Sequence, residues 1–168
     1  MLKLSFISLL FISSLANAEE TRHANVHVHG LNNLTMVLSQ NQIAITYEMP
    51  IIQLYEEHEE HEEHEELAIK NESLKAFENH LQLFEFPIGA ECELSSFKSE
   101  LHNVSTEGDH KDIELSYEFY CNEPNLLNGI QINAFERFDD LQMVNFDAII
   151  NNQGFIKSFN SLESKITF

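Results

Sequence analysis

The chain has 168 residues, of which 43% are hydrophobic, and this length and apolar content suit one domain with its own core. Its 28 acidic residues outnumber the 9 basic ones, so the formal net charge is −19. Such a charge repels nucleic acid and anionic lipid and attracts cations, which excludes nucleic-acid binding as an expected function.

The first 18 residues have the pattern of a signal peptide. A basic start at Lys3 precedes an apolar run from Leu4 to Leu15, and Ala16-Asn17-Ala18 is the small-x-small sequence of a signal-peptidase site. The apolar run is too short for a bilayer, which needs about 20 residues. We therefore expect residues 1–18 to be removed and residues 19–168 to form one soluble, exported domain without membrane insertion.

Residues 26–49 alternate between apolar and polar side chains, which predicts a β-hairpin interrupted at Ser39-Gln40-Asn41-Gln42. His27 and His29 are two residues apart, so on a strand they project from the same face, about 6–7 Å apart. Two imidazoles placed in this way can bind one metal ion. His23 lies four residues upstream, where a tail that folds back could supply a third ligand.

The stretch Glu56–Glu66 consists of histidine and glutamate alone. A buried carboxylate costs several kcal/mol unless it is paired, so the stretch must face water or a cation. Imidazole suits zinc, copper(II) and nickel(II), and carboxylate adds charge and further ligands. We interpret the stretch as a metal collector that binds through His58, His61 and His64. The alternative is a solvated acidic segment in which the histidines are incidental.

The three-residue spacing limits what these histidines can do. On a helix, successive imidazoles are neighbours but drift roughly 60° around the axis at each step, so two can share an ion and three cannot converge neatly. A metalloprotease motif needs two histidines four apart, and Glu62 occupies the position of the second one. A zinc protease of that type is therefore excluded.

An apolar stripe with helical spacing follows the acidic stretch and ends before Pro87. It predicts one main amphipathic helix. His80 lies beside the stripe and is expected to be structural. The stripe comprises Leu67, Leu74, Phe77, Leu81 and Phe84.

The remaining sequence predicts strands separated by turn signals. The fold expected is therefore α+β: a single domain of mostly antiparallel β-strands with one main amphipathic helix. His102, Asp109 and His110, in and beside the loop between the first two strands, are weaker metal candidates, and an ordinary polar loop is the preferred interpretation there. The predicted strands are 91–101, 112–121, 127–138, 142–151, 155–159 and 164–168.

Cys92 and Cys121 are the two cysteines of the chain. An even number in an exported chain favours a disulfide, which would stabilise the fold by roughly 3–4 kcal/mol in the chain-entropy model. The rival interpretation is two free thiols that bind metal. No nucleophile motif, phosphate-binding glycine loop or dinucleotide fingerprint is present in the sequence, so no catalytic residue is predicted.

Several short motifs occur together in this order: a signal peptide, His27-Val28-His29-Gly30, Glu57-His58, two spaced cysteines, Phe135–Phe138 and Gln153-Gly154. In this combination the chain resembles the ZrgA-like family of periplasmic zinc-binding proteins. The resemblance implies a protein of Gram-negative bacteria that binds zinc without catalysis and assists an ABC importer. It maps the metal ligands to the two histidine motifs. Many members carry a histidine and aspartate tract between the cysteines, whereas here the histidine tract precedes the predicted helix.

We therefore predict a periplasmic accessory protein that captures or buffers zinc and supports its uptake through an ABC importer, with a periplasmic solute-binding protein or the importer itself as partner. Copper and nickel suit the same ligands. One alternative is a zinc-dependent hydrolase, which needs three fixed ligands and a positioned base. Another is an acidic interaction module without a metal role, which would be indifferent to chelator.

Overall fold

A computed structural model describes residues 30–54, 74–103 and 111–168 of the chain. The side chains of Ile52, His102, Asn103 and Lys111 are outside this description, although their backbone is included. The predicted signal peptide and the predicted start of the helix at Leu67 also lie outside it.

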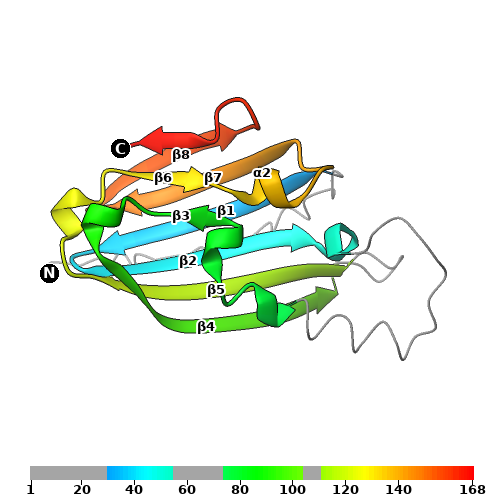
Figure 1. Cartoon of the computed structure of the whole chain (residues 1–168), viewed down its shortest axis with the longest axis horizontal. Helices are drawn as coiled ribbons and strands as arrows, with labels where there is room; N and C mark the ends of the chain where they lie inside the picture. Colours follow the sequence, from blue (N-terminus) through cyan, green and yellow to red (C-terminus); the bar gives the residue numbers. More distant parts are fainter. Residues whose placement is uncertain (1–29, 55–73, 104–110) are drawn as a thin grey trace, which may run out of the picture.

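The described residues form two β-sheets, one in front of the other (Figure 1). The larger sheet has six strands in the order β4-β5-β2-β1-β7-β8, and the smaller has three in the order β3-β6-β9. The strands are β1 (Leu31–Ser39), β2 (Gln42–Pro50), β3 (Phe84–Glu85), β4 (Cys92–Asn103), β5 (Lys111–Cys121), β6 (Gly129–Ile132), β7 (Met143–Ile150), β8 (Gln153–Phe159) and β9 (Lys165–Thr167). The short helices are η1 (Ile51–Leu54), η2 (His80–Gln82), η3 (Ile88–Ala90) and η4 (Pro124–Leu126), all of the 3-10 type, and α2 (Ala134–Arg137).

The hairpin of β1 and β2 confirms the predicted alternation. Leu34, Met36 and Leu38 are buried on one face of β1, and Ser39 pairs with Gln42 across a turn in which Gln40 has a positive φ of 57°. The β7–β8 hairpin turns at Asn151-Asn152, with φ values of 50° and 66°. Asparagine tolerates this left-handed conformation better than most residues, which is why the turn forms there.

The structure confirms the expected fold class in part, because the described residues are mostly β-strand, but their helices are all short and the expected main amphipathic helix is not found among them. In the predicted helical stripe, residues 74–76 are helical, and the chain then passes through a turn and η2 into β3. Leu81 is 52% exposed, whereas Phe77 and Phe84 are fully buried. The carbonyl of Leu83 accepts hydrogen bonds from the backbone of residues 133 and 134, so tertiary pairing overrides the helical spacing.

One further expectation was wrong, because the predicted strand 127–138 is divided into β6 and α2, with Asn133 between them. The expectation of mostly antiparallel strands is confirmed. Among the described strands β1 and β7 pair in parallel, with Leu34 opposite Phe146.

Aromatic side chains fill the space between the two sheets. Phe84 of β3 packs edge-on against Tyr117 of β5, with ring centroids 5.4 Å apart, and Phe86 packs edge-on against Phe119 at 5.2 Å. All but Phe86 are at most 2% exposed, so this cluster joins the smaller sheet to the larger one.

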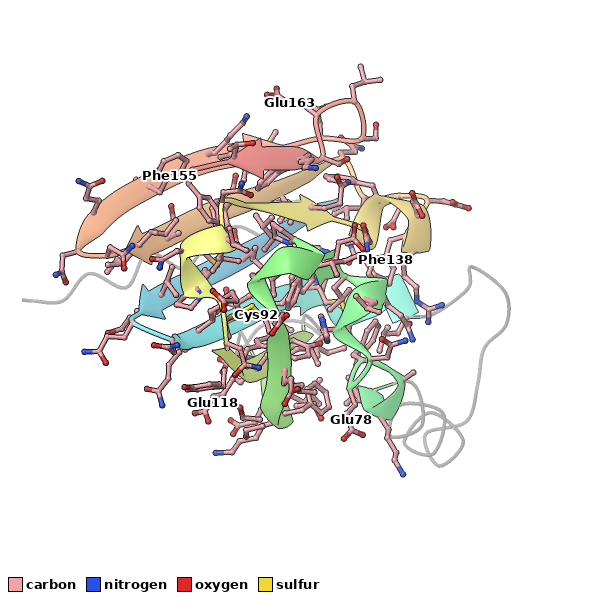
Figure 2. The ribbon with its side chains drawn as sticks, turned by 60° about the vertical axis from the view of Figure 1, so that its left-hand side comes forward. Glu78, Cys92, Glu118, Phe138, Phe155 and Glu163 are labelled. Carbon is pink, nitrogen blue, oxygen red and sulfur yellow. A yellow bond between two sulfur atoms is a disulfide. The ribbon has the colours of Figure 1, made fainter. Side chains whose placement is uncertain are left out.

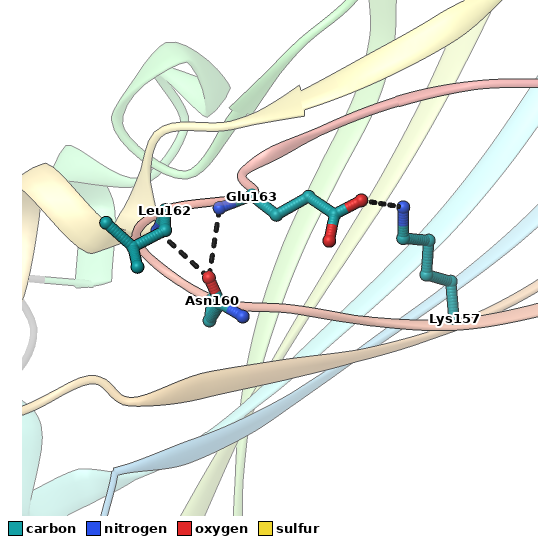
Figure 3. A network of polar contacts seen from close by, with 4 residues as sticks. All are labelled: Lys157, Asn160, Leu162 and Glu163. Atoms are coloured by element: carbon teal, nitrogen blue, oxygen red, sulfur yellow. Dashed lines mark hydrogen bonds and ion pairs between the residues drawn. The ribbon is translucent and has the colours of Figure 1, made fainter.

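The chain crosses from the larger to the smaller sheet at a polar turn between β8 and β9 (Figure 3). The side-chain oxygen of Asn160 accepts hydrogen bonds from the backbone N–H groups of Leu162 and Glu163, at 2.9 and 3.0 Å. Lys157 of β8 pairs with Glu163 at 2.6 Å. These contacts fix the direction in which the last strand leaves the large sheet.

Candidate metal-binding end of the sheet

Most of the predicted metal ligands lie outside the described residues. The backbone of His102 belongs to β4, where it pairs with Asp112 of β5. In the part of the chain that the structure describes, no group of three or more histidine, cysteine, aspartate or glutamate side chains is arranged to hold a metal ion. The ligands outside the description are His23, His27, His29, His58, His61, His64, Asp109 and His110.

The described residues that border these histidine-bearing segments converge at one end of the large sheet. β1 begins at Leu31 after the first segment, β2 leads through η1 into the second, and the third connects Asn103 of β4 to Lys111 of β5. The register places Asn103 opposite Lys111 and Pro50 opposite Asp112. We call this end of the large sheet the junction end.

The four strands β4, β5, β2 and β1 are adjacent in the sheet. Neighbouring strands lie about 4.8 Å apart, so the four points of attachment at the junction end span roughly 15 Å. Figure 1 shows the start of β1 and the ends of β2 and β4 on the same side of the molecule. The topology therefore anchors three segments that are distant in sequence within a short distance of one another.

A row of three glutamates crosses the large sheet near the junction end. Glu48 of β2 pairs with Glu114 of β5, which in turn pairs with Glu100 of β4. Their strand neighbours Met49 and Ile113 are buried, so the glutamate row lies on the outer face, away from the smaller sheet. The Ser116 hydroxyl donates a hydrogen bond to Glu114 at 3.1 Å. Like charges in register raise the negative potential at this end, which attracts cations.

Two buried hydrogen bonds stabilise the inner face of the large sheet, which packs against the core. The side-chain amide of Asn32 donates to the Tyr47 hydroxyl at 2.8 Å, and the Tyr117 hydroxyl donates to the carbonyl of Phe77 at 2.8 Å. Burial raises the pKa of Tyr47 and of Tyr117, so both hydroxyls stay protonated. The Tyr117 bond fastens the residues that follow the acidic stretch to the large sheet.

His80 packs as a structural side chain. Its ring lies 4.8 Å from Phe119, edge to face, and 5.6 Å from Phe84. Desolvation by burial lowers the pKa of His80, which favours the neutral imidazole.

Cys92 and Cys121 form a disulfide, as predicted (Figure 2). They pair directly across β4 and β5, where β4 begins and β5 ends. This is the opposite end of these strands from the junction end. The rival interpretation of two free metal-binding thiols is therefore wrong in this structure.

Sequence reasoning predicted the histidines as ligands, which lie outside the described side chains, and it did not predict the glutamate row. Glu48, Glu100 and Glu114 are far apart in the sequence, and only the pairing of β2 and β4 with β5 brings them into line. No local sequence signal distinguishes these glutamates, because each is one of the alternating polar residues that an ordinary strand contains.

Comparison with known proteins identifies one family. Residues 26–168 match the family model described as "ZrgA family zinc uptake protein". No curated protein matches the chain. No helix in residues 30–54, 74–103 or 111–168 has the length and apolar character needed to cross a membrane.

Proposed function

The chain belongs to the ZrgA family of zinc uptake proteins, and from this we propose that it is a periplasmic accessory protein that captures zinc and supports its uptake through an ABC importer, without catalysing a reaction. Residues 1–18 serve as the export signal in this proposal, and residues 19–168 are the zinc-binding domain. A periplasmic solute-binding protein or the importer itself receives the metal.

The observation that carries the proposal is the convergence of the strand termini at the junction end. Zinc in proteins is usually four-coordinate, with nitrogen, sulfur or oxygen ligands. Segments anchored within roughly 15 Å of one another can contribute ligands to shared ions. We assign zinc binding to His23, His27, His29, His58, His61 and His64, and weaker binding to His102, Asp109 and His110.

Two classes of site follow from where the histidines are attached. His27 and His29 are three residues and one residue before Gly30, close to the start of β1, so we expect binding there to require less ordering of the chain. Residues in a longer connection must be ordered around each ion, at a cost of about 1–2 kcal/mol for each backbone residue fixed. We therefore expect a tight site at His27 and His29 and weaker sites at His61, His64 and their glutamates.

The ligand chemistry also sets the pH range of capture. Imidazole binds zinc only when it is neutral, and its usual pKa is about 6.5. Zinc affinity should therefore fall as the pH falls through about 6.5. The negative charge of the chain, −19 in total, raises the local concentration of cations at every site.

Zinc titration of the protein lacking residues 1–18, followed by calorimetry and native mass spectrometry, tests the proposal. We expect a tight phase and at least one weaker phase. His27→Ala with His29→Ala should abolish the tight phase, whereas His61→Ala with His64→Ala should remove only weak binding. If the first variant titrates like the wild type and the second loses the tight ion, the acidic stretch is the principal site instead.

Two further measurements bear on the functional class. Titrations with copper(II) and nickel(II) compare the metals that suit the same ligands. The zinc-loaded protein should not hydrolyse ester, peptide or phosphate substrates above background. A turnover that chelator abolishes would contradict the non-catalytic part of the proposal.

A further inference from the structure

Strand β8 forms an open margin of the large sheet. It pairs with β7 from end to end without a register shift, and none of the described strands lies on its other side. The pairs alternate between hydrogen-bonded and non-hydrogen-bonded, beginning with the bonded pair Ile150–Gln153 that flanks the two-residue turn. The backbone N–H and C=O groups of Gly154, Ile156 and Ser158 therefore point away from β7. Such a row of groups is a template for a further strand.

The opposite margin of the sheet, at β4, is protected in ways that β8 is not (Figure 1). The pairing of β4 is irregular between Leu94 and Ser96, and a bulge of this kind hinders further pairing. β4 and β5 together contain five acidic and two basic residues, so their formal charge is −3. β7 and β8 contain one acidic and one basic residue, Asp147 and Lys157, so their formal charge is zero. In a chain of net charge −19, a second copy meets less repulsion at β8 than at β4.

Apolar side chains accompany the open margin on the outer face of the sheet. Ile156 is 86% exposed and Ile149 is 51% exposed. Gly154 is paired with Ile149, and a Cβ at Gly154 would meet nothing within 4 Å. Val37 of β1 is paired with Ile149 on its other side. Proteins usually protect an apolar edge strand against pairing, so an unprotected one indicates a partner.

The inner face of β8 does not oppose pairing. Lys157 points toward the smaller sheet, and a charge in this position on an edge strand can prevent pairing. Here that charge is compensated within the chain, because Glu163 lies 2.6 Å away (Figure 3). Phe155, on the same face, packs edge-on against Phe168 with ring centroids 6.1 Å apart.

We propose that β8 pairs antiparallel with β8 of a second copy of this chain, so that the two large sheets become one continuous sheet across a twofold axis. The Ile156 residues of the two copies lie opposite each other, and Gly154 of each copy lies opposite Ser158 of the other. In this register all the outward-pointing backbone groups of these residues pair. On the inner face, Phe155 of each copy lies opposite Lys157 of the other, whose apolar stem packs on the ring.

This pairing does not involve the junction end, so it is independent of the function proposed above. Sedimentation equilibrium of the protein lacking residues 1–18, in EDTA over a series of protein concentrations, measures the association without metal bridges. We expect a monomer–dimer equilibrium. If the wild type is a monomer throughout the series, the proposal is wrong.

The first variants test the margin. Ile156→Lys should weaken dimerisation about tenfold or more, because it removes two apolar side chains and places like charges opposite each other. Ile88→Lys is the matched control, since Ile88 is 96% exposed but lies in η3, outside the large sheet. It should change dimerisation less than twofold. If both variants weaken the dimer equally, overall charge is the cause and β8 is not the interface.

A second variant tests the backbone pairing itself. The N–H group of Ile156 points away from β7, so Ile156→Pro removes a donor to the second copy without removing a bond within the sheet. Circular dichroism should show that the variant is folded, and its dimerisation should be weakened about tenfold or more. A folded variant that dimerises like the wild type would overturn the proposed pairing.

Mixing two charge variants tests the register. Ile156→Lys and Ile156→Glu should each be mainly monomeric alone, because each places like charges opposite each other. An equal mixture of the two should sediment as a dimer again, because opposite charges then lie directly across the strands. If the mixture stays monomeric, the Ile156 residues do not lie opposite each other, and the twofold register is wrong.

Discussion

Tyr117 contributes to this fold through both its aromatic ring and its hydroxyl. Its ring packs on Phe84 and Phe97, at centroid distances of 5.4 and 5.1 Å, and its hydroxyl donates to the carbonyl of Phe77. The bond joins β5 to the chain that follows the acidic stretch. Because burial raises the pKa of Tyr117, the hydroxyl remains a donor throughout the physiological pH range.

Tyr117→Phe should therefore lower the free energy of unfolding by about 1–3 kcal/mol, because the buried carbonyl of Phe77 loses its partner. Urea unfolding followed by circular dichroism measures the change. Tyr120→Phe is the matched control, since Tyr120 lies three residues further along β5 and is 48% exposed. An equal effect in both variants would show that the Phe77 bond does not contribute.

His80 gives the fold a dependence on acidity. Burial lowers the pKa of His80 below the unfolded value of 6.5, so the unfolded chain binds a proton more readily than the folded one. The contribution of neutral His80 to the free energy of unfolding is fully present above about pH 6.5 and is lost as the pH falls below that value. The effect is measured as the difference between the wild type and a His80 variant.

We expect His80→Phe to reduce the loss of unfolding free energy between pH 7.5 and pH 5.5, because phenylalanine keeps the packing against Phe84 and Phe119 without titrating. Urea unfolding of the zinc-free protein at both pH values measures this loss. If wild type and variant lose the same free energy, the burial of His80 has no bearing on acid sensitivity.

At the scale of elements, the sequence predicted strands well where burial alternates. Residues 112–121 and 142–151 match β5 and β7 closely, because each strand has one face toward the core. The local apolar pattern gave a wrong prediction where tertiary contacts determine the secondary structure. The apolar spacing from Leu74 to Phe84 is helical, yet the backbone of Leu83 bonds to residues 133 and 134 and directs the chain into β3.

The disulfide acts on the edge hairpin of the large sheet. Cys92 and Cys121 are 29 residues apart in sequence, and they join β4, an edge strand, to β5. Cys92→Ser with Cys121→Ser should lower the free energy of unfolding by about 3–4 kcal/mol in the chain-entropy model. Zinc stoichiometry should be unchanged, because the pair lies at the opposite end of these strands from the junction end.

Thermal unfolding and native mass spectrometry of that double variant measure both effects. Reduction of the wild-type disulfide provides an independent comparison. Loss of a bound zinc ion in the double variant would mean that the disulfide end supports the metal site.

At the scale of the whole molecule, we expect the core to fold without metal. The buried side chains of the two sheets are apolar with few exceptions, and one of these, Asn32, is hydrogen-bonded to Tyr47. A domain of this kind differs from zinc fingers, which unfold without their ion. We therefore expect the protein in EDTA to unfold cooperatively on heating, with zinc adding stability by ligand binding alone.

Calorimetry with and without EDTA tests this expectation. A non-cooperative transition in EDTA would show that zinc is part of the fold.

The sequence could predict only some parts of the candidate site. Histidine content is visible in the linear chain, whereas the glutamate row depends on strand pairings between distant residues.

The parallel pairing of β1 with β7 has a consequence for the order of folding. β1 is the first described strand, and it lies between β2 and β7 in the sheet, so the large sheet cannot be completed until residues 143–150 are available. Contacts between such distant residues slow folding, because a long loop must close first. In the export across a membrane that we propose for this chain, such a delay would keep it unfolded, and so competent for transport, until nearly all of it has crossed.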